Sequence, residues 1–471
     1  MPLNVRAASR LLPILAVWLS AATAQAATIQ AVLAPISADS IERRIKALAA
    51  FGTRHTASET QSETRGIGAA RRWIERELRD CSNKSGGRLQ VSTQRWQEPP
   101  GRGLPNGAEL VNVLATLPGR AEHGPSRVLV VSGHYDSRNS NNDDAVGDAP
   151  GANDDASGTA VVMELACAFA PHTFDATIIF LAVAGEEQGL LGATHFARLA
   201  TQSSLPIEAM ITNDIVGSAT GDQGQRDPNR IRLFAGGVDP LLQAWLQMMG
   251  RRPVDPSEQA FMEAVQNRIQ SIALAGGAED LPAFQLARYI KQVAEQNAPS
   301  LHIQLIKRRD RYLRGGDHLP FLERGYAAVR MTEPFENFRH QHQDVRIQDG
   351  KSFGDLPEFV EPEYVATVAK ANGTALASLA WAPPPPTGVV MDVSVLTNTT
   401  TLSWNTDPSG LARAYRVHWR QTDAVTWEGS QQLGAETKVT LPLSKDSYIF
   451  GVSSVSDRGF ESLAVYPMPR R

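Results

Sequence analysis

The 471-residue sequence contains only two cysteines, Cys81 and Cys167. Two thiolates are too few to build a structural zinc site from cysteine alone, so a metal site in this chain would have to use His, Asp and Glu side chains. The two cysteines can form at most one disulfide. Because Cys167 lies in a segment that predicts the buried face of a helix, a disulfide and a buried free thiol are both open.

Basic residues are not in excess. The formal net charge is −4, with 20% of residues charged and 42% apolar. No concentration of Lys and Arg indicates a nucleic-acid-binding face, so no nucleic-acid partner is expected. The composition is that of a globular protein with a full core, and the length allows two or three domains.

Long apolar runs are also missing, apart from one at the N-terminus. There, Arg6 and Arg10 precede a mostly apolar stretch over 11–22, and the segment ends in the small-x-small pattern Ala24-Gln25-Ala26. The stretch is shorter than the ~20 residues that span a bilayer. This pattern predicts a signal peptide over 1–26 and an exported chain, periplasmic or secreted, with no integral membrane segment after cleavage.

Several catalytic motifs are absent from the sequence. It has no G-x-S-x-G nucleophile motif, no H-E-x-x-H helix and no phosphate-binding P-loop. Neither cysteine lies in a motif that indicates a nucleophile. Any catalytic chemistry therefore has to come from another constellation of side chains.

Apolar strands alternate with helices through the middle of the chain. Such continuous apolar strands are typical of a sheet that is covered on both faces. We expect an α/β domain over 27–382, in which helices sandwich a mainly parallel mixed sheet, with a helical lid-like region at about 240–300. The expected strands that carry the argument are 127–133, 176–184 and 208–217, and the helices between them are 157–170 and 193–200.

The pattern changes after four prolines at 383–386, which predict a stiff linker over 383–388. Short alternating strands then predict a small β-sandwich over 389–471. With Trp404, Tyr415 and Tyr448 in its strands, this region resembles a fibronectin type III module. We expect it to be a spacer, or to contact a surface or a polymer.

Polar side chains gather at the predicted strand ends. Ligands of open α/β sheets bind beyond the carboxyl ends of the strands, and several carboxylates that meet there repel one another unless a cation is present. Histidines among carboxylates favour zinc or a similar first-row metal over calcium or magnesium. The residues concerned are His134, Asp136, Asp154, Asp155, Glu186, Glu187, Asp214, His340, His342 and Asp344.

Each of these residues alone has a structural explanation. His134 is compatible with a hydrogen-bonded core histidine, Asp154 with a helix N-cap, and Asp214 with a turn after a strand. Their joint occurrence at successive strand ends is what favours a metal centre.

The motif order GHYDS … PGANDDASG … GEEQGLLG … ND … GGDHLPF … HQHQD, from about residue 40 to 380, resembles that of the secreted bacterial di-zinc aminopeptidases, which are related to plasma glutamate carboxypeptidase. The resemblance implies a zinc exopeptidase fold. It also implies two zinc ions that share one carboxylate and one water.

The resemblance also implies a role for each motif residue. Asp154 would bridge the two ions, His134 and Asp214 would complete one site, and Glu187 and a late histidine would complete the other. Asp136 would accept the imidazole N–H of His134. Glu186, adjacent to a ligand, would act as the general base; the simpler alternative makes Glu186 the ligand and leaves Glu187 exposed.

The late histidine has two candidates. A His followed four residues later by Asp selects His340 before Asp344, but His342 is also available. If the segment is extended, both histidines face the same side, so direction does not separate them. Asp317 and His318 match the motif too, with a pocket-side structural role expected for both and His318 as the reserve ligand.

We therefore predict an exported zinc exopeptidase that hydrolyses N-terminal residues from peptides. One alternative is a dipeptidase or glutamate carboxypeptidase, which a basic residue such as Arg314 or Arg330 near the site would favour. A glutaminyl cyclase-type acyltransferase would use one zinc. A non-catalytic protein would use the β-sandwich to attach to a surface.

Overall fold

The computed structural model describes residues 25–120, 127–236, 259, 263 and 278–470. The predicted signal peptide, apart from its last two residues, and most of the predicted lid-like region lie outside the described residues. The chain divides into two compact units. Among the described residues, those within 35–376 belong to one unit, and those within 377–470 and 25–34 belong to the other.

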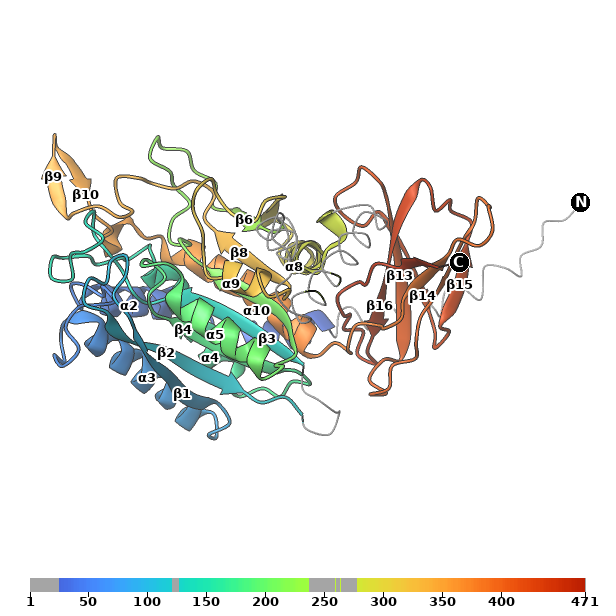
Figure 1. Ribbon diagram of the computed structural model, residues 1–471, viewed down its shortest axis with the longest axis horizontal. Coiled ribbons are helices and arrows are strands. Elements are labelled where there is room, and N and C mark those ends of the chain that lie inside the picture. The colour runs from blue at the N-terminus through green and yellow to red at the C-terminus, as the bar shows by residue number, and fades with distance from the viewer. Residues whose placement is uncertain (1–24, 121–126, 237–258, 260–262, 264–277, 471) are drawn as a thin grey trace, which may run out of the picture. The chain divides into compact units, whose positions relative to one another are not determined.

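An eight-stranded mixed sheet forms the centre of the larger unit (Figure 1), in the order β1-β2-β4-β3-β5-β8-β6-β7. Neighbouring strands are parallel in the pairs β4/β3, β3/β5, β5/β8 and β6/β7 and antiparallel in the other three. The strands are β1 (Gln90–Glu98), β2 (Ala108–Leu117), β3 (Val128–His134), β4 (Thr177–Val183), β5 (Ile207–Asn213), β6 (Arg230–Phe234), β7 (His302–Ile306) and β8 (Ala328–Thr332).

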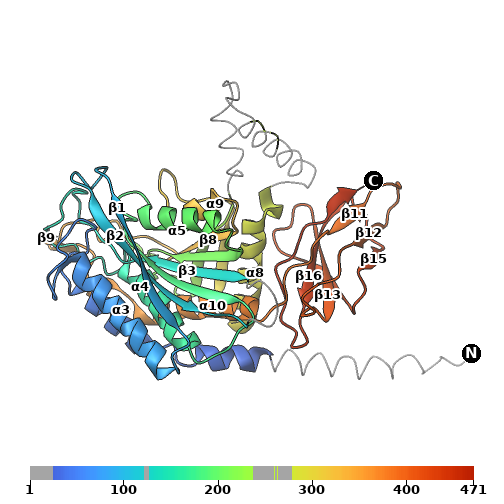
Figure 2. The same ribbon diagram turned by 60° about the horizontal axis from the view of Figure 1, so that its bottom comes forward.

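Helices cover both faces of this sheet, which confirms the predicted α/β fold. Helices α5 and α9 lie on one face, and α3, α4 and α10 lie on the other (Figure 2). The helices are α2 (Ala38–Ala49), α3 (Gly66–Lys84), α4 (Ala156–Phe169), α5 (Leu191–Gln202), α8 (Pro282–Asn297), α9 (Leu319–Leu322) and α10 (Pro362–Ala380), with short 3₁₀ turns at Ala278–Asp280 and Pro357–Phe359.

The middle strands are buried because they pack on both sides. All seven residues of β3 are buried, and β4 is buried from Ile178 onwards. On the α5 face, Val128 and Val130 pack with Phe196 and Phe321. Burial of apolar side chains on two faces explains why these strands are continuous apolar runs.

Helix α4 approaches the end of β3 very closely. A Cβ atom on Gly133 would lie 2.5 Å from the backbone of Gly158, and a Cβ atom on Gly158 would lie 2.2 Å from the carbonyl oxygen of Asn213. The side chain of Asp155 caps α4 by accepting the amide N–H of Gly158 at 2.9 Å. Asp155 is therefore the N-cap, and the neighbouring Asp154 is left for another role.

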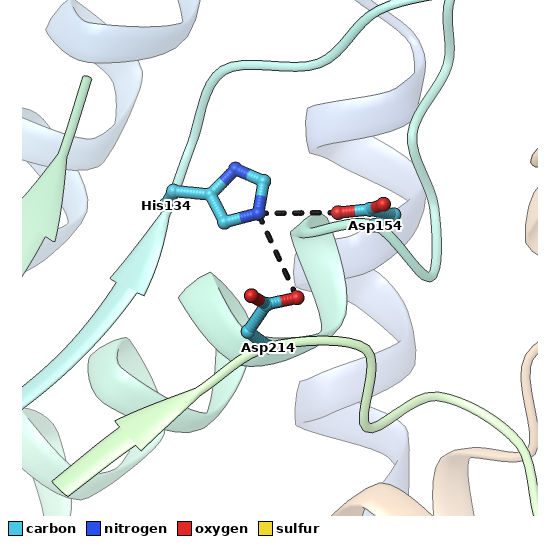
Figure 3. Close-up of side chains that lie close together, drawn as sticks. All are labelled: His134, Asp154 and Asp214. Carbon is cyan, nitrogen blue, oxygen red and sulfur yellow. Dashed lines mark ion pairs between the residues drawn. The ribbon is translucent and has the colours of Figure 1, made fainter. Parts of the chain in front are cut away.

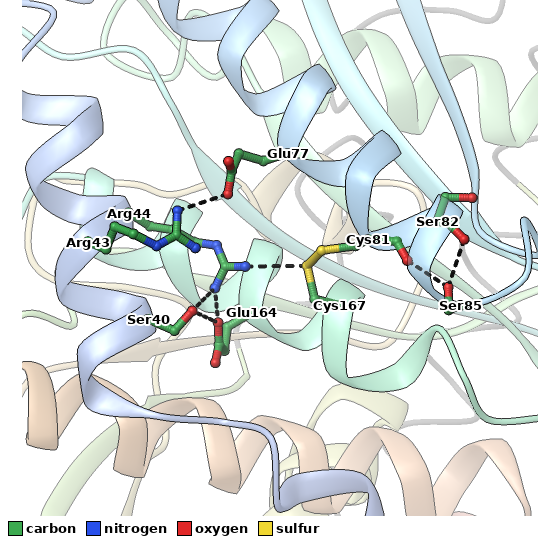
Figure 4. The surroundings of a disulfide bond; sticks show 9 residues. All are labelled: Ser40, Arg43, Arg44, Glu77, Cys81, Ser82, Ser85, Glu164 and Cys167. Carbon is green, nitrogen blue, oxygen red and sulfur yellow. Dashed lines mark hydrogen bonds and ion pairs between the residues drawn. A yellow bond between two sulfur atoms is a disulfide. The ribbon is translucent and has the colours of Figure 1, made fainter.

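A disulfide joins Cys81 of α3 to Cys167 of α4 (Figure 4). Arg44 of α2 donates to the Cys167 sulfur at 3.3 Å and also forms a buried ion pair with Glu164 of α4. These contacts tie the outer helices to α4, and they settle the state of the two cysteines, which the sequence left open.

The smaller unit contains two β-sheets, ordered β15-β12-β11-β17 and β14-β13-β16. Its core includes Trp404 and Tyr415, whose rings meet edge to face at 5.4 Å, together with Phe450. The strands are β11 (Val390–Asp392), β12 (Thr400–Ser403), β13 (Ala414–Gln421), β14 (Gly429–Leu433), β15 (Lys438–Leu441), β16 (Tyr448–Val455) and β17 (Met468–Arg470), whereas the small hairpin β9 (Arg346–Gln348) and β10 (Lys351–Phe353) belongs to the larger unit.

Length and apolar character decide whether a helix among the described residues could cross a membrane. In this part of the chain, no helix combines the length and the apolar character needed to cross a bilayer.

Removal of the disulfide should destabilise the larger unit. The bridge joins residues 86 positions apart, so its loss releases a long loop in the unfolded chain. We expect the free energy of unfolding to fall by about 2–4 kcal/mol in urea titrations with reductant. The double variant Cys81→Ser, Cys167→Ser should match the reduced protein and should not respond to reductant. Equal stability of the oxidised and reduced proteins would contradict this account.

Candidate metal centre

The polar residues predicted from the sequence meet beyond the carboxyl ends of β3, β4 and β5. His134 is the last residue of β3, Glu186 and Glu187 follow β4, and Asp214 directly follows β5. Asp154 lies in the loop that leads into α4. These ends belong to adjacent parallel strands, which is why residues so far apart in sequence come together.

His134, Asp154 and Asp214 form the first group (Figure 3), with one ligand atom from each within 4.8 Å of the others. His134 Nε2 is 3.1 Å from Asp154 Oδ1 and 3.9 Å from Asp214 Oδ1. Among the described residues, this buried nitrogen has no hydrogen-bond partner of acceptable geometry. A buried imidazole nitrogen that faces two carboxylate oxygens without a hydrogen bond fits a metal ion such as zinc.

Asp154, Glu187 and His342 form the second group, defined by the same distance limit. His342 Nε2 is 2.9 Å from Asp154 Oδ2 and 2.9 Å from Glu187 Oε1. Asp154 thus belongs to both groups, with one oxygen facing each. Burial alone would raise the pKa of Asp154, but His342 and His134 hold it well below its usual range, so this carboxylate is negatively charged.

His340, the favoured late histidine, is not brought to this centre. Residues 338–342 form a turn rather than the extended segment that would have placed both histidines on one side. In the turn, the His340 ring stacks on Phe359 with ring centroids 3.7 Å apart. His342 has a φ of 54°, a rare value for a residue other than glycine, and it is His342 that reaches Glu187.

Glu186 lies beside the two groups without belonging to either. Its Oε2 is 4.0 Å from His134 Nε2. Burial raises the pKa of Glu186 well above its usual range; His134 opposes this shift, whereas Asp214 and Glu187 add to it. The side chain is therefore a carboxylate with a strong tendency to accept a proton, close to the possible ligands.

Asp136 differs in detail from its predicted role. The imidazole Nδ1 of His134 is 3.2 Å from the backbone carbonyl oxygen of Asp136 and 3.6 Å from the carboxylate Oδ1. The carboxylate accepts the amide N–H groups of Glu186 and Glu187 instead, each at 3.2 Å. Asp136 therefore orients the histidine mainly through its backbone and the two glutamates through its side chain.

Two buried residues that sequence reasoning missed hold the Asp154 loop. Asp355 accepts the amide N–H groups of Asn153 and Asp154 at 2.8 and 2.7 Å. Arg54 donates to the carbonyl oxygen of Gly151 at 2.9 Å and to that of Tyr135 at 2.6 Å, which ties this loop to the end of β3. Neither residue lies in a motif, so the sequence carried no signal for them.

Two arginines contact the carboxylates of the groups. Arg330 of β8 is fully buried; its Nη2 is 3.0 Å from Asp214 Oδ1 and its Nη1 is 3.3 Å from Asp310 Oδ2. Arg138 lies 3.0 Å from Glu187 through its Nε. Asp214 and Glu187, the carboxylates that belong to only one group each, are thus both paired with a guanidinium group.

Asp317 and His318 are buried, but they belong to neither group. Neither carboxylate oxygen of Asp317 has a hydrogen-bond partner among the described residues, and burial raises its pKa to about 8. His318 Nε2 contacts the carbonyl oxygen of Arg309 at 2.6 Å, so the reserve ligand is used elsewhere. Asp317 lies close enough to His134 and Asp214 to interact with them electrostatically, and the role expected for it from the sequence stays a prediction.

Comparisons with known proteins place this centre in a family context. The profile of Peptidase family M28 matches residues 112–251, which include four of the five residues of the two groups and Glu186. A crystal structure of LapA from Legionella pneumophila superposes with a TM-score of 0.50 at 18% identity, covering 75% of this chain and 76% of that one. At this identity the likeness concerns the fold alone.

Curated relatives are much closer in sequence, and they are fungal proteins. A probable zinc metalloprotease of Leptosphaeria maculans is 47% identical over 441 residues, which is 94% of this chain and 97% of the relative. One from Pyrenophora tritici-repentis is 45% identical over 441 residues, covering 94% of this chain and 87% of the relative. A chain so similar over nearly its whole length, with the M28 profile over its central residues, belongs to peptidase family M28.

Proposed function

We propose that the protein is a zinc-dependent exopeptidase that uses two zinc ions to remove N-terminal residues from peptides. The observation that carries this proposal is the position of Asp154 in both metal-binding groups, with Glu186 beside them but in neither. The donor set of two histidines and three carboxylates suits zinc. The names of the fungal relatives, probable zinc metalloproteases, support the same chemistry.

The residues that would hold the ions are those of the two groups, His134, Asp154 and Asp214 on one side and Asp154, Glu187 and His342 on the other. Zinc would supply Lewis acidity, which polarises a peptide carbonyl group and makes water a nucleophile at neutral pH. The buried Nε2 of His134, which lacks a hydrogen bond, is the structural feature that fits an ion best.

Glu186 would carry the proton through the reaction. Its carboxylate takes a proton from the attacking water, the oxygen adds to the carbonyl carbon, and the C–N bond then breaks as Glu186 delivers the proton to the leaving amine. A raised pKa suits a group that must both accept and release a proton. The carboxylate of Asp136 holds the backbone of Glu186 in place by accepting the amide N–H of Glu186.

The carboxypeptidase alternative depended on a basic residue that could recognise a substrate carboxylate. Arg330 is paired with Asp214 and Asp310, and Arg314 is paired with Glu336. Because both arginines already have carboxylate partners, their positions do not favour this alternative. The presence of both groups favours two ions over the single zinc of a glutaminyl cyclase-type acyltransferase.

Export of the protein is part of the proposal. The disulfide between Cys81 and Cys167 supports it, because structural disulfides persist in oxidising compartments.

Glu186→Gln should separate catalysis from metal binding. Loss of the general base should lower kcat by about 10²–10⁴-fold, with zinc content unchanged. The neighbouring Glu187→Gln is the matched control, and it should lower zinc content as well as turnover. Metal analysis and steady-state kinetics measure both effects. Near-normal kcat in Glu186→Gln would rule out this residue as the base.

His340→Ala and His342→Ala test the choice of histidine. After dialysis against zinc-free buffer, His342→Ala should retain fewer zinc ions per chain than the wild type, because the second group loses a ligand. His340→Ala should retain the wild-type number, since this ring lies against Phe359. Elemental analysis of both variants gives the answer, and the opposite pattern would restore His340 as the ligand.

The direction of cleavage can be tested with matched substrates. The zinc-loaded protein should release p-nitroaniline from amino-acid p-nitroanilides and should leave the same compounds intact when their amino group is acetylated. An N-blocked peptide with a free C-terminal glutamate should not be cleaved. Cleavage of that blocked peptide alone would establish the carboxypeptidase alternative, and ammonia release from glutaminyl peptides would establish the cyclase.

A further inference from the structure

Arg138 joins three segments at the second group. It lies four residues after His134, and its Nε donates to Glu187 Oε2 at 3.0 Å. Its Nη2 is 2.6 Å from Nδ1 of His342, and its Nη1 donates to the carbonyl oxygen of Asn139 at 3.2 Å. The side chain is 18% exposed, so the guanidinium group lies at the edge of the centre rather than in the core.

The arginine of the first group is held differently. Arg330 is completely buried between two carboxylates, Asp214 and Asp310, the second of which also pairs with Arg311. Arg138 has one carboxylate partner, Glu187, and its other side-chain contact is the imidazole of His342. Arg138 thus has fewer carboxylate partners than Arg330, and its positive charge opposes the binding of a further cation at the second group.

The hydrogen bond to His342 adds a geometric conflict. An arginine has only N–H donors, so Nδ1 of His342 has to accept. A neutral histidine that binds a metal through Nε2 carries its proton on Nδ1, where it normally donates to an oxygen. The contact between Arg138 and Nδ1 and an ion on Nε2 therefore exclude each other.

We propose that Arg138 is the cation of the second group before metal binding, when it holds Glu187 and His342 together. It has to withdraw when a metal ion enters. The second group is therefore the weaker and more exchangeable of the two metal sites. The inference rests on the metal-binding part of the proposed function. It assigns to Arg138 a positioning role that sets metal affinity, distinct from the catalytic role of Glu186.

Zinc affinity of the Arg138→Met variant is the direct test. Metal-free protein is titrated with zinc against a chromogenic chelator, which reports the dissociation constants without any substrate. The wild type should show a tighter and a weaker class of site. In Arg138→Met, the dissociation constant of the weaker class should fall about tenfold or more, since a unit positive charge near the ion is removed. The tighter class should not change.

Two further variants separate charge from contact. Arg138→Lys keeps the charge, so its weaker class should stay close to that of the wild type. Arg127→Met removes an arginine that pairs with Glu208 at 2.9 Å at the opposite end of β3, and both classes should be unchanged. In the double variant Arg138→Met, His342→Ala, the gain in affinity should disappear, which assigns the effect to the second group.

Several results would overturn the inference. Unchanged constants in Arg138→Met, or weaker zinc binding at the second group, would show that Arg138 only orients the ligands. A wild type that binds no zinc would overturn the inference together with the metal-binding part of the proposed function. If Arg138→Met does not fold, Arg138→Gln carries the same test. If Arg138→Met changes the zinc affinity as expected but the protein hydrolyses no peptide, the inference stands and the exopeptidase proposal is refuted. If the protein hydrolyses peptides but the zinc affinity is unchanged in Arg138→Met, the exopeptidase proposal stands and the inference is refuted.

Discussion

Mutual repulsion of buried carboxylates is the constraint around which this centre is organised. At 4 Å, two like charges near a protein surface repel by about 4 kcal/mol. The centre brings eight carboxyl groups into one buried region, and few cationic side chains lie among them. The acidic residues are Asp136, Asp154, Asp155, Glu186, Glu187, Asp214, Asp317 and Asp355, and the arginines are Arg54, Arg138 and Arg330.

The protein relieves this repulsion in two ways besides ion pairing. Some carboxylates accept backbone amides, as Asp136, Asp155 and Asp355 do. Others have a raised pKa because of burial, which is the case for Glu186 and Asp317. Asp154, Asp214 and Glu187 instead face His134 and His342 in the two groups, and this is where a cation fits.

The strand ends could be predicted from the sequence because they depend on local patterns. The apolar runs before His134, Glu186 and Asp214 predicted buried strands, and adjacent parallel strands bring their ends together. The supporting contacts are of another kind. Asp355 lies 201 residues from Asp154, and Arg138 lies 204 residues from His342, so no periodicity links the partners. The choice between His340 and His342 could not be made from the sequence for a related reason, since it depends on a turn that the tertiary contacts determine.

The close approach of α4 to β3 has a consequence for variation within the centre. Where Gly133 meets Gly158, main chain touches main chain, and no side chain lies between them to adapt. The spacing between His134 and the start of α4 is thus set by atomic contact radii. Substitutions in the surrounding loops can change which substrates fit. At Gly133 and Gly158, by contrast, any larger residue would clash with the main chain.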